Sequence, residues 1–295
     1  MVREPIHIVL VCDDYYTILM GAFLKSIELN YHGEVPIETY IIDDNISTKN
    51  RRKISSTLTT GKFNLHWIKM TDAIPKDAEL PFINNYYPLN ILARLFIPHF
   101  IPSHIQRIIY FDVDMIMLDD ITNLWHIDIG ENIIGAISDT IGLDAKDKTL
   151  ADGIANYAEL GLNPALKYFN SGLLIIDVDK WKQHDITAKT LRVISENKTH
   201  AKLSDQYGLN VTLAGSWFEV DPKWSCFSVH EIPNPSLIHY FYRKPIYKSY
   251  TFKYRDEFYH YLEQTAWKGF KPIGDTSRYF KKVKNLLHKL LFKFR

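Results

Sequence analysis

The chain has 295 residues, of which 46% are hydrophobic and 23% charged, and its formal net charge is +1. This composition is typical of a globular protein with a large core, and it excludes extended disorder as the default for any long segment. The near-zero charge provides no overall field toward nucleic acid, so we expect no nucleic-acid partner.

The N-terminal apolar run at 6–12 predicts a strand, because it is too short for a signal sequence or a membrane span and is followed at once by two aspartates. Cys12 and Cys226 offer neither a disulfide framework nor a CxxC metal spacing, which favours a reducing, cytoplasmic location. The patterns that follow predict a helix at 16–29, strands at 37–43 and 64–70, and a helix at 88–101 that ends against Pro98.

Further strands are predicted at 107–118, 132–139 and 167–181, and a helix at 185–197. Such alternation predicts an α/β fold with a Rossmann-like, doubly wound, mostly parallel sheet flanked by helices. From about residue 215 the sequence is irregular and rich in aromatic residues and proline. Without a repeat or a convincing linker, we expect one domain over 1–275 and a separate tail at 276–295.

Two carboxylates, Asp112 and Asp114, interrupt the apolar text of "RIIYFDVDMIML". In an extended chain they point to the same face, while Val113 points back into the core. Paired carboxylates need a compensating charge, and a divalent cation such as Mg²⁺ or Mn²⁺ supplies it while leaving positions open for substrate phosphates. The alternative is a solvated strand end or turn, since D-x-D is a common pattern.

The chain contains several motifs in a fixed order, namely "HIVLVCDDYY", "ARL", "IIYFDVDMIMLDDITNLW", "GAISD", "YFNSGLLIIDVDKW", "LSDQYGLN" and "IHYFYRKP". Together they resemble glycosyltransferase family 8, the retaining, nucleotide-sugar-dependent enzymes that include bacterial lipopolysaccharide galactosyl- and glucosyltransferases. This resemblance implies a GT-A type fold and a D-x-D site that binds Mn²⁺, with Mg²⁺ as a possible substitute, together with the diphosphate of a UDP-sugar.

The resemblance also implies roles for particular residues. Asp112, Asp114 and His239 would complete the metal site, Val113 would belong to the nucleotide-sugar site, and Lys244 would neutralise the departing UDP. A lone histidine in such an aromatic stretch is otherwise a hydrogen-bonded structural residue.

At the first strand end, Asp13 matches the residue expected to accept the uracil N3–H and Tyr16 the aromatic near the base. Alternatively, Asp13 or Asp14 caps the following helix. Arg94 of "ARL" would bind phosphate or orient a carboxylate, and as a bare feature it is a helix arginine.

Asp139, Asn170, Asp205 and Gln206 match the donor-sugar and reaction-centre positions of the family. Asp205 equally suits a helix N-cap, and Asn170 the start of a β-bulge. We expect Asp139, Asp205 and Gln206 to be catalytic, with the Gln206 carbonyl stabilising an oxocarbenium-like centre while the acceptor attacks from the face of departure. Tyr207 stands where the family commonly has a second acid.

These features predict a hexosyltransferase that moves galactose or glucose from a UDP-sugar to a glycan or lipid-linked acceptor in bacterial cell-surface polysaccharide or lipopolysaccharide synthesis. A catalytically weakened nucleotide-sugar-binding protein is one alternative, suggested by Tyr207 and the altered "HYFYRKPIY" stretch. A nucleotide-sugar pyrophosphorylase is another, although "VCDDYYTILMG" is not the glycine-rich, basic loop that such an enzyme needs.

The C-terminal segment 278–295 combines an apolar stripe with seven Lys and Arg residues. The pattern predicts an interfacial amphipathic helix that binds an anionic membrane, so we expect peripheral association with the inner face of the cell membrane. The alternative is a terminal helix packed on the domain or on a partner. The stripe consists of Phe280, Val283, Leu287, Leu290 and Phe294.

Overall fold

The computed structural model describes residues 4–81, 89–140, 146–281, 283 and 285. The chain forms two compact units, each built from separate segments. Among the described residues, no helix is long and apolar enough to cross a bilayer. The first unit comprises Met1–Met70, Ile108–Asp128 and Asp221–Asp275, and the second comprises Thr71–Arg107, Ile129–Val220 and Thr276–Arg295.

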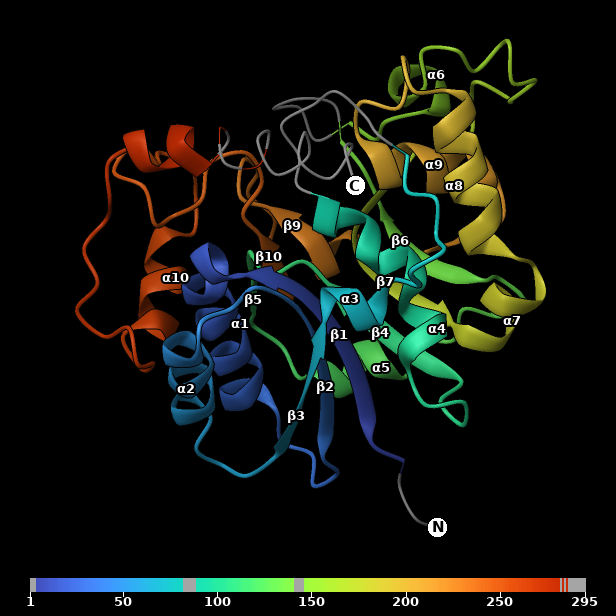
Figure 1. Ribbon diagram of the computed structural model, residues 1–295. Helices are drawn as coiled ribbons and strands as arrows, with labels where there is room; N and C mark the ends of the chain where they lie inside the picture. Colours follow the sequence, from blue (N-terminus) through green and yellow to red (C-terminus); the bar gives the residue numbers. More distant parts are fainter. Residues whose placement is uncertain (1–3, 82–88, 141–145, 282, 284, 286–295) are drawn as a thin grey trace. The chain divides into compact units, whose positions relative to one another are not determined.

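A parallel sheet forms the base of the first unit, with β2 between β3 and β1, and β4 on the other side of β1 (Figure 1). Helices follow the first two strands, which confirms the predicted β-α-β opening. The strand interiors are apolar, as in a sheet covered on both faces. The elements are β1 (Ile6–Asp13), η1 (Asp14–Tyr16), α1 (Thr17–Asn30), β2 (Ile37–Asp44), α2 (Thr48–Thr57), β3 (Phe63–Lys69) and β4 (Arg107–Phe111).

The prediction of a single strand over 107–118 is wrong. β4 ends at Phe111, and the chain bends through Asp112–Asp114 before β5 (Met115–Met117) enters a second sheet. There β5 pairs antiparallel with β10 (Leu237–His239), which pairs parallel with β9 (Cys226–Phe227). This bend places Asp112 and Asp114 outside both strands, whereas the neighbouring residues of β4 and β5 are buried. The two carboxylates therefore avoid the cost of burial in the core of a sheet.

An aromatic core supports this second sheet. α1 packs against β5 and against α10 (Arg255–Leu262), and residues of all three elements belong to one buried hydrophobic cluster. Gly21 of α1 permits the close approach of Trp267, since a Cβ there would lie 2.7 Å from the indole ring. Two short elements complete the first unit, α5 (Ile121–Trp125) and η3 (Pro222–Ser225).

The second unit contains a mixed three-stranded arrangement, in which β6 pairs antiparallel with β7 and parallel with β8. The predicted strand at 167–181 stops early, because the Asp177 side chain accepts a hydrogen bond from Lys180 N and so caps α7. Its elements are α3 (Met70–Ala73, which begins in the first unit), β6 (Ile134–Ser138), α6 (Leu150–Gly153), β7 (Phe169–Asp177), α7 (Val178–Gln183), α8 (Ile186–Glu196), α9 (Ser204–Thr212) and β8 (Phe218–Glu219).

The helix predicted at 88–101 is divided. A 3₁₀ helix, η2 (Leu89–Phe96), precedes α4 (Ile97–Phe100), and Pro98 lies in the first turn of α4. Proline is tolerated there because the first N–H groups of a helix have no intrahelical acceptor, so it begins a helix here instead of ending one.

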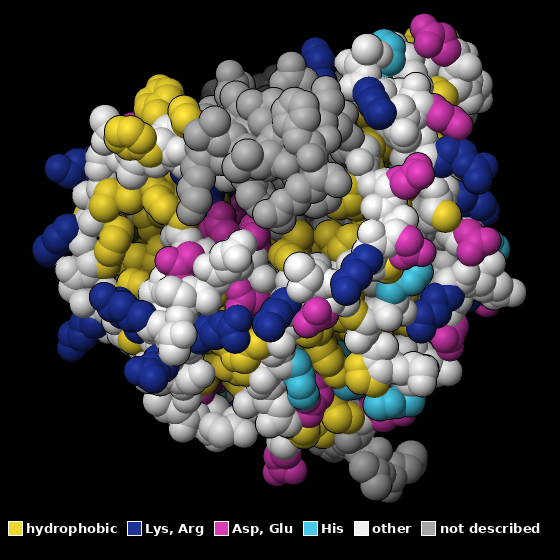
Figure 2. Space-filling view, viewed as in Figure 1, with side chains coloured by type: hydrophobic (Ala, Val, Ile, Leu, Met, Phe, Trp, Pro, Cys, Tyr) yellow, Lys and Arg dark blue, Asp and Glu magenta, His cyan; other side chains and the backbone are white. Residues whose placement is uncertain are grey.

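Residues 276–281 of the predicted tail are helical, and apolar side chains on this segment face solvent. Tyr279, Phe280 and Val283 are among the most exposed large hydrophobic residues of the described chain. Figure 2 shows hydrophobic side chains at the surface where Figure 1 places this red segment. Leu287, Leu290 and Phe294 of the predicted stripe lie outside the described residues.

Candidate functional site

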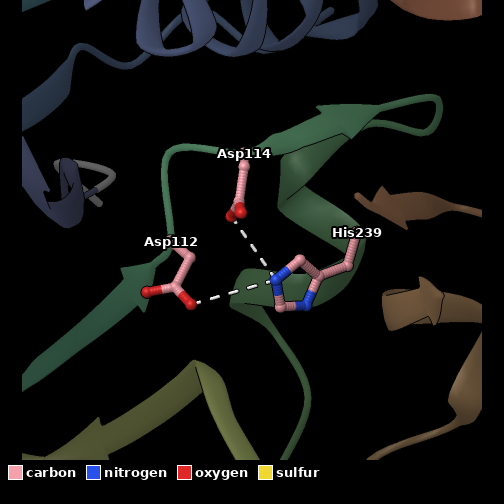
Figure 3. Close-up of side chains that lie close together, drawn as sticks. All are labelled: Asp112, Asp114 and His239. Atoms are coloured by element: carbon pink, nitrogen blue, oxygen red, sulfur yellow. Dashed lines mark ion pairs between the residues drawn. The ribbon is translucent and has the colours of Figure 1, made fainter. Parts of the chain in front are cut away.

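In the first unit, Asp112, Asp114 and His239 point toward one another (Figure 3). The Nε2 atom of His239 lies 3.4 Å from Asp114 Oδ1 and 3.9 Å from Asp112 Oδ2, and all three ligand atoms are within 4.8 Å of one another. Among the described residues this is the one such group of three that can hold a metal ion. The cluster therefore has the composition and spacing of a divalent-metal site.

Strand pairing brings His239 to the two aspartates. His239 lies opposite Met115 in the antiparallel β5–β10 ladder, and Tyr240 N donates to the Asp114 carbonyl oxygen at 2.9 Å. Asp112 is held from the other side, because the buried Tyr110 hydroxyl donates to its Oδ1 at 2.7 Å. Val113 between them is buried, as predicted.

The charges in the cluster fit a cation. Asp114 Oδ1 is buried, and none of its neighbours in the described chain donates a hydrogen bond to it. Burial opposes ionisation of Asp114, but Lys244 and His239 outweigh it and hold the pKa of this carboxyl well below its usual range. Asp114 is therefore ionised at neutral pH, with an oxygen available as a metal ligand. Lys244 forms an ion pair with the same carboxylate and donates to the Tyr240 carbonyl at 2.7 Å.

The two aspartates at the junction of β1 and η1 have different hydrogen-bond partners. Asp13 Oδ1 accepts a hydrogen bond from Tyr16 N at 3.1 Å and caps η1, while Asp14 Oδ1 accepts from Ser47 N and the Asn50 amide, at 2.8 Å each. The capping alternative for Asp13 is thus realised, and its contact with uracil stays a prediction. Burial raises the pKa of Tyr16, so this phenol stays protonated at neutral pH.

A second cluster lies wholly within the second unit and centres on Gln206. Its Nε2 donates to Asp139 Oδ2 at 3.1 Å, and its Oε1 accepts from Ser171 N at 3.1 Å and from the Asn170 amide at 3.3 Å. Lys148 forms an ion pair with Asp139 at 2.9 Å. The predicted reaction-centre residues Asp139, Asn170 and Gln206 are therefore joined in one buried network.

Arg94 and Asp205 connect to this network as a buried ion pair. Arg94 Nε lies 3.1 Å from Asp205 Oδ2, and the two side chains are only 7% and 6% exposed. Arg94 also donates to the Ser171 carbonyl at 2.6 Å. Of the two roles considered for Arg94, the carboxylate-orienting contact is present. Asp205 is not the N-cap of α9, since Leu203 takes that position.

Backbone irregularities bring the network together. The β6–β7 register shifts between Ala136, opposite Leu174, and Ile137, opposite Asn170, so the expected bulge is present beside Asn170. Gly208 allows α9 to approach α8, because a Cβ at this position would lie 2.6 Å from the Ile194 side chain. Close packing of α9 fixes the helix turn that carries Gln206.

Tyr207, which replaces the expected acid, has a structural contact. Its side chain is buried, and its hydroxyl donates to the Asn156 side-chain oxygen at 2.8 Å. The Asn156 amide in turn donates to Asn197 Oδ1 at 2.8 Å. This chain of hydrogen bonds accounts for a tyrosine at a position where an acid was expected.

Lys148 and Tyr110 also contact site carboxylates, although no sequence motif marks either residue as part of the site. Lys148 lies in an irregular polar stretch, where no sequence pattern connects it to Asp139. Tyr110 is an apolar-looking strand residue whose hydroxyl matters only because the chain bends after it. Each of them contacts a carboxylate that was predicted to belong to the site, Asp139 for Lys148 and Asp112 for Tyr110.

The sequence and the structure agree with those of known glycosyltransferases. The family model for glycosyl transferase family 8 matches residues 7–263, and the chain belongs to this family. General stress protein A of Bacillus subtilis is 28% identical over 286 residues, covering 90% of this chain and 95% of that protein. A putative glycosyltransferase of Haemophilus influenzae is 27% identical over 207 residues, covering 70% and 59% of the two chains.

Solved structures show the same fold. The galactosyltransferase LgtC, in complex with donor and acceptor sugar analogues, superposes with a TM-score of 0.71 at 23% identity, covering 88% of this chain and 96% of that one. The bifunctional glycosyltransferase WbbM superposes with a TM-score of 0.73 at 19% identity, covering 91% of this chain and 51% of the other. The protein is thus a glycosyltransferase with a GT-A fold, as predicted.

Proposed function

We propose that the protein is a retaining hexosyltransferase that takes galactose or glucose from a UDP-sugar and transfers it to a glycan or lipid-linked acceptor. The convergence of Asp112, Asp114 and His239, with Lys244 alongside, carries this proposal. A bound divalent cation, Mn²⁺ in preference to Mg²⁺, would balance the charge of the donor diphosphate there. LgtC, a galactosyltransferase solved with a donor analogue, supports the choice of donor class.

Within the first unit, Asp112, Asp114 and His239 would hold the cation. Lys244 would exchange its ion pair with Asp114 for one with the diphosphate, because an ammonium group is a strong point-charge partner for phosphate. Asp13 and Tyr16 would bind the uracil, as the family resemblance implies. In this role Tyr16 would supply an aromatic face near the base, and Asp13 would accept the uracil N3–H.

The Gln206 network would bind the donor sugar and act at the anomeric carbon. Gln206 is fixed by hydrogen bonds to Asn170, Ser171 and Asp139, so its carbonyl dipole is preorganised. A carboxamide is a weak nucleophile, which favours attack by the acceptor from the face that UDP leaves. A phosphate oxygen of the leaving UDP would then take the proton of the acceptor hydroxyl, and configuration would be retained.

A turnover assay tests the proposal. The protein is incubated with UDP-galactose, UDP-glucose or UDP-N-acetylglucosamine, with Mn²⁺ or with EDTA, and released UDP and the anomer of the product are measured. We expect metal-dependent release with one hexose preferred, and loss of at least about 100-fold in the Asp112→Ala and Asp114→Ala variants. Equal activity of either variant would contradict the metal assignment.

The same assay separates the two alternatives. Binding of the UDP-sugar without turnover would indicate a catalytically weakened nucleotide-sugar-binding protein. Pyrophosphate formation from UTP and a sugar phosphate would indicate a pyrophosphorylase. Asp112→Ala is the sharper metal variant, because Asp114→Ala also removes the ion-pair partner of Lys244 and is expected to lower stability.

A further inference from the structure

Tyr242 has an unusual backbone conformation in the loop that joins His239 to Lys244. Its φ is +58°, in the left-handed region that bulky residues rarely adopt, and the residue is 50% exposed. Such conformations are strained and cluster at functional sites. Glycine adopts this conformation without a side-chain clash, so a tyrosine here needs another explanation.

A second left-handed tyrosine, Tyr254, is explained by its contacts. Its hydroxyl contacts Cys226 Sγ at 3.5 Å and accepts from Ile232 N at 3.3 Å, and its carbonyl accepts from the Tyr240 hydroxyl at 2.8 Å. Tyr242 has no comparable set, because no described residue forms a hydrogen bond with its hydroxyl. Contacts among the described residues therefore account for Tyr254, whereas about half of the surface of Tyr242 is exposed.

The ring of Tyr242 is nevertheless held in place. Its centroid lies 4.3 Å from that of Phe241 and 6.4 Å from that of Phe252. The loop is fixed at both ends, by Tyr240 N on the Asp114 carbonyl and by the ion pair of Lys244 with the same residue. A rigid, half-exposed aromatic ring thus stands two residues from the proposed diphosphate-binding lysine.

We propose that Tyr242 is a stacking surface for the pyranose ring of the acceptor sugar. This inference rests on the proposed function, in which a glycan must approach the loop that holds the donor diphosphate. A tyrosine ring offers an apolar face for the C–H groups of a hexose and a hydroxyl for its polar edge, at little entropic cost. In the proposed function the Gln206 network binds the donor sugar. Tyr242 would therefore contact the acceptor sugar and contribute to acceptor affinity.

Saturation-transfer NMR tests the proposal without knowledge of the natural acceptor. The probes are methyl β-galactoside, methyl β-glucoside and methyl β-N-acetylglucosaminide, each with UDP and Mg²⁺, which is diamagnetic. For at least one sugar we expect transfer to the C–H protons of one ring face in the wild type and in Tyr242→Phe. The signal should fall roughly five- to tenfold in Tyr242→Gly and Tyr242→Asn, which tolerate a positive φ but lack the ring.

The nucleotide signals serve as the control. UDP signals of equal strength in all four proteins would show that the loop and the metal site are intact. Sugar signals that survive in Tyr242→Gly, or that are absent for every probe in the wild type, would overturn the inference alone, and so would loss of the UDP signal in the two ring-less variants. Absence of UDP binding in the wild type would contradict the proposed function itself.

Discussion

Lys244 and Asp114 form a partly buried ion pair inside the candidate metal site, so the carboxylate that would bind a cation already has a cationic partner. Replacing Lys244 with Gln removes a like charge, and we expect Mn²⁺ affinity of the nucleotide-free protein to rise about three- to tenfold. UDP affinity at saturating Mn²⁺ should fall about tenfold, because the ammonium no longer contacts the diphosphate. Isothermal titration calorimetry measures both.

The exposed Lys248 provides a matched control, and Lys248→Gln should change neither affinity. A parallel fall of both affinities in Lys244→Gln would show instead that the lysine supports the fold of the loop.

Gln206→Ala should lower kcat about 10- to 100-fold and change the donor KM less than threefold. Its carbonyl is held by Ser171 and Asn170, and its interaction with the sugar strengthens as positive charge develops at the anomeric carbon. Steady-state kinetics on the preferred UDP-sugar check this, with the exposed Gln183→Ala as control. An unchanged kcat with weaker donor binding would assign Gln206 a binding role only.

The Arg94–Asp205 pair should show strong coupling in stability. Arg94→Met leaves the buried Asp205 carboxylate without its guanidinium and should cost about 3–5 kcal/mol, and Asp205→Asn should also destabilise, since it leaves the guanidinium without its carboxylate. The double variant should lose clearly less than the sum of the two single variants. Urea unfolding of all four proteins gives the coupling free energy, and strict additivity would mean that the pair contributes no mutual stabilisation.

Glu28 should make stability sensitive to acid. Burial opposes its ionisation, but hydrogen bonds from Lys25, Thr60 and Thr59 outweigh this and hold the pKa of Glu28 below its ordinary value of 4.5. The ionised form therefore stabilises the fold above pH 4.5, and this contribution is lost as the pH falls through the lower, folded-state pKa. Unfolding free energies at pH 7, 5 and 4 should depend less on pH in Glu28→Gln, and equal pH slopes would contradict the assignment.

Removal of residues 277–295 tests the membrane proposal. We expect the truncated protein to keep metal-dependent donor hydrolysis but to sediment far less with anionic liposomes at moderate salt, because the basic, apolar tail is absent. A Phe280→Ser, Val283→Ser double variant should weaken binding in the same direction, since both side chains are exposed. Equal sedimentation of full-length and truncated protein would refute the anchor.

The sequence predicted most elements because their patterns are local. The apolar runs of β1 and β2, the helical spacing of α1 and the D-x-D pair all lie within short windows. The sheet change at Asp112 was not predicted, since only pairing with β10 shows that Met115 leaves the first sheet. Lys148 was missed for a similar reason: its partner Asp139 is chosen by tertiary contacts.

The family resemblance, and not spacing, selected His239, because a single histidine in an aromatic stretch carries no distinctive pattern. Its place opposite Met115 is a property of the β5–β10 register. For Asp205, in contrast, a local sequence pattern was present but suggested the wrong contact. Its position before a helix suggested a cap, but burial beside Arg94 gives the carboxylate a different partner.

The antiparallel pairing of β5 with β10 determines when the candidate metal site is completed during synthesis on the ribosome. His239 comes from a chain segment synthesised long after Asp112 and Asp114, and the whole of Ile129–Val220 belongs to the other unit. The emerging first half of the chain would therefore present the two aspartates before their histidine has been synthesised, because the β5–β10 contact is long-range. Metal affinity would therefore appear only late in synthesis, and a stalled chain ending before β10 should bind Mn²⁺ far more weakly than the full chain.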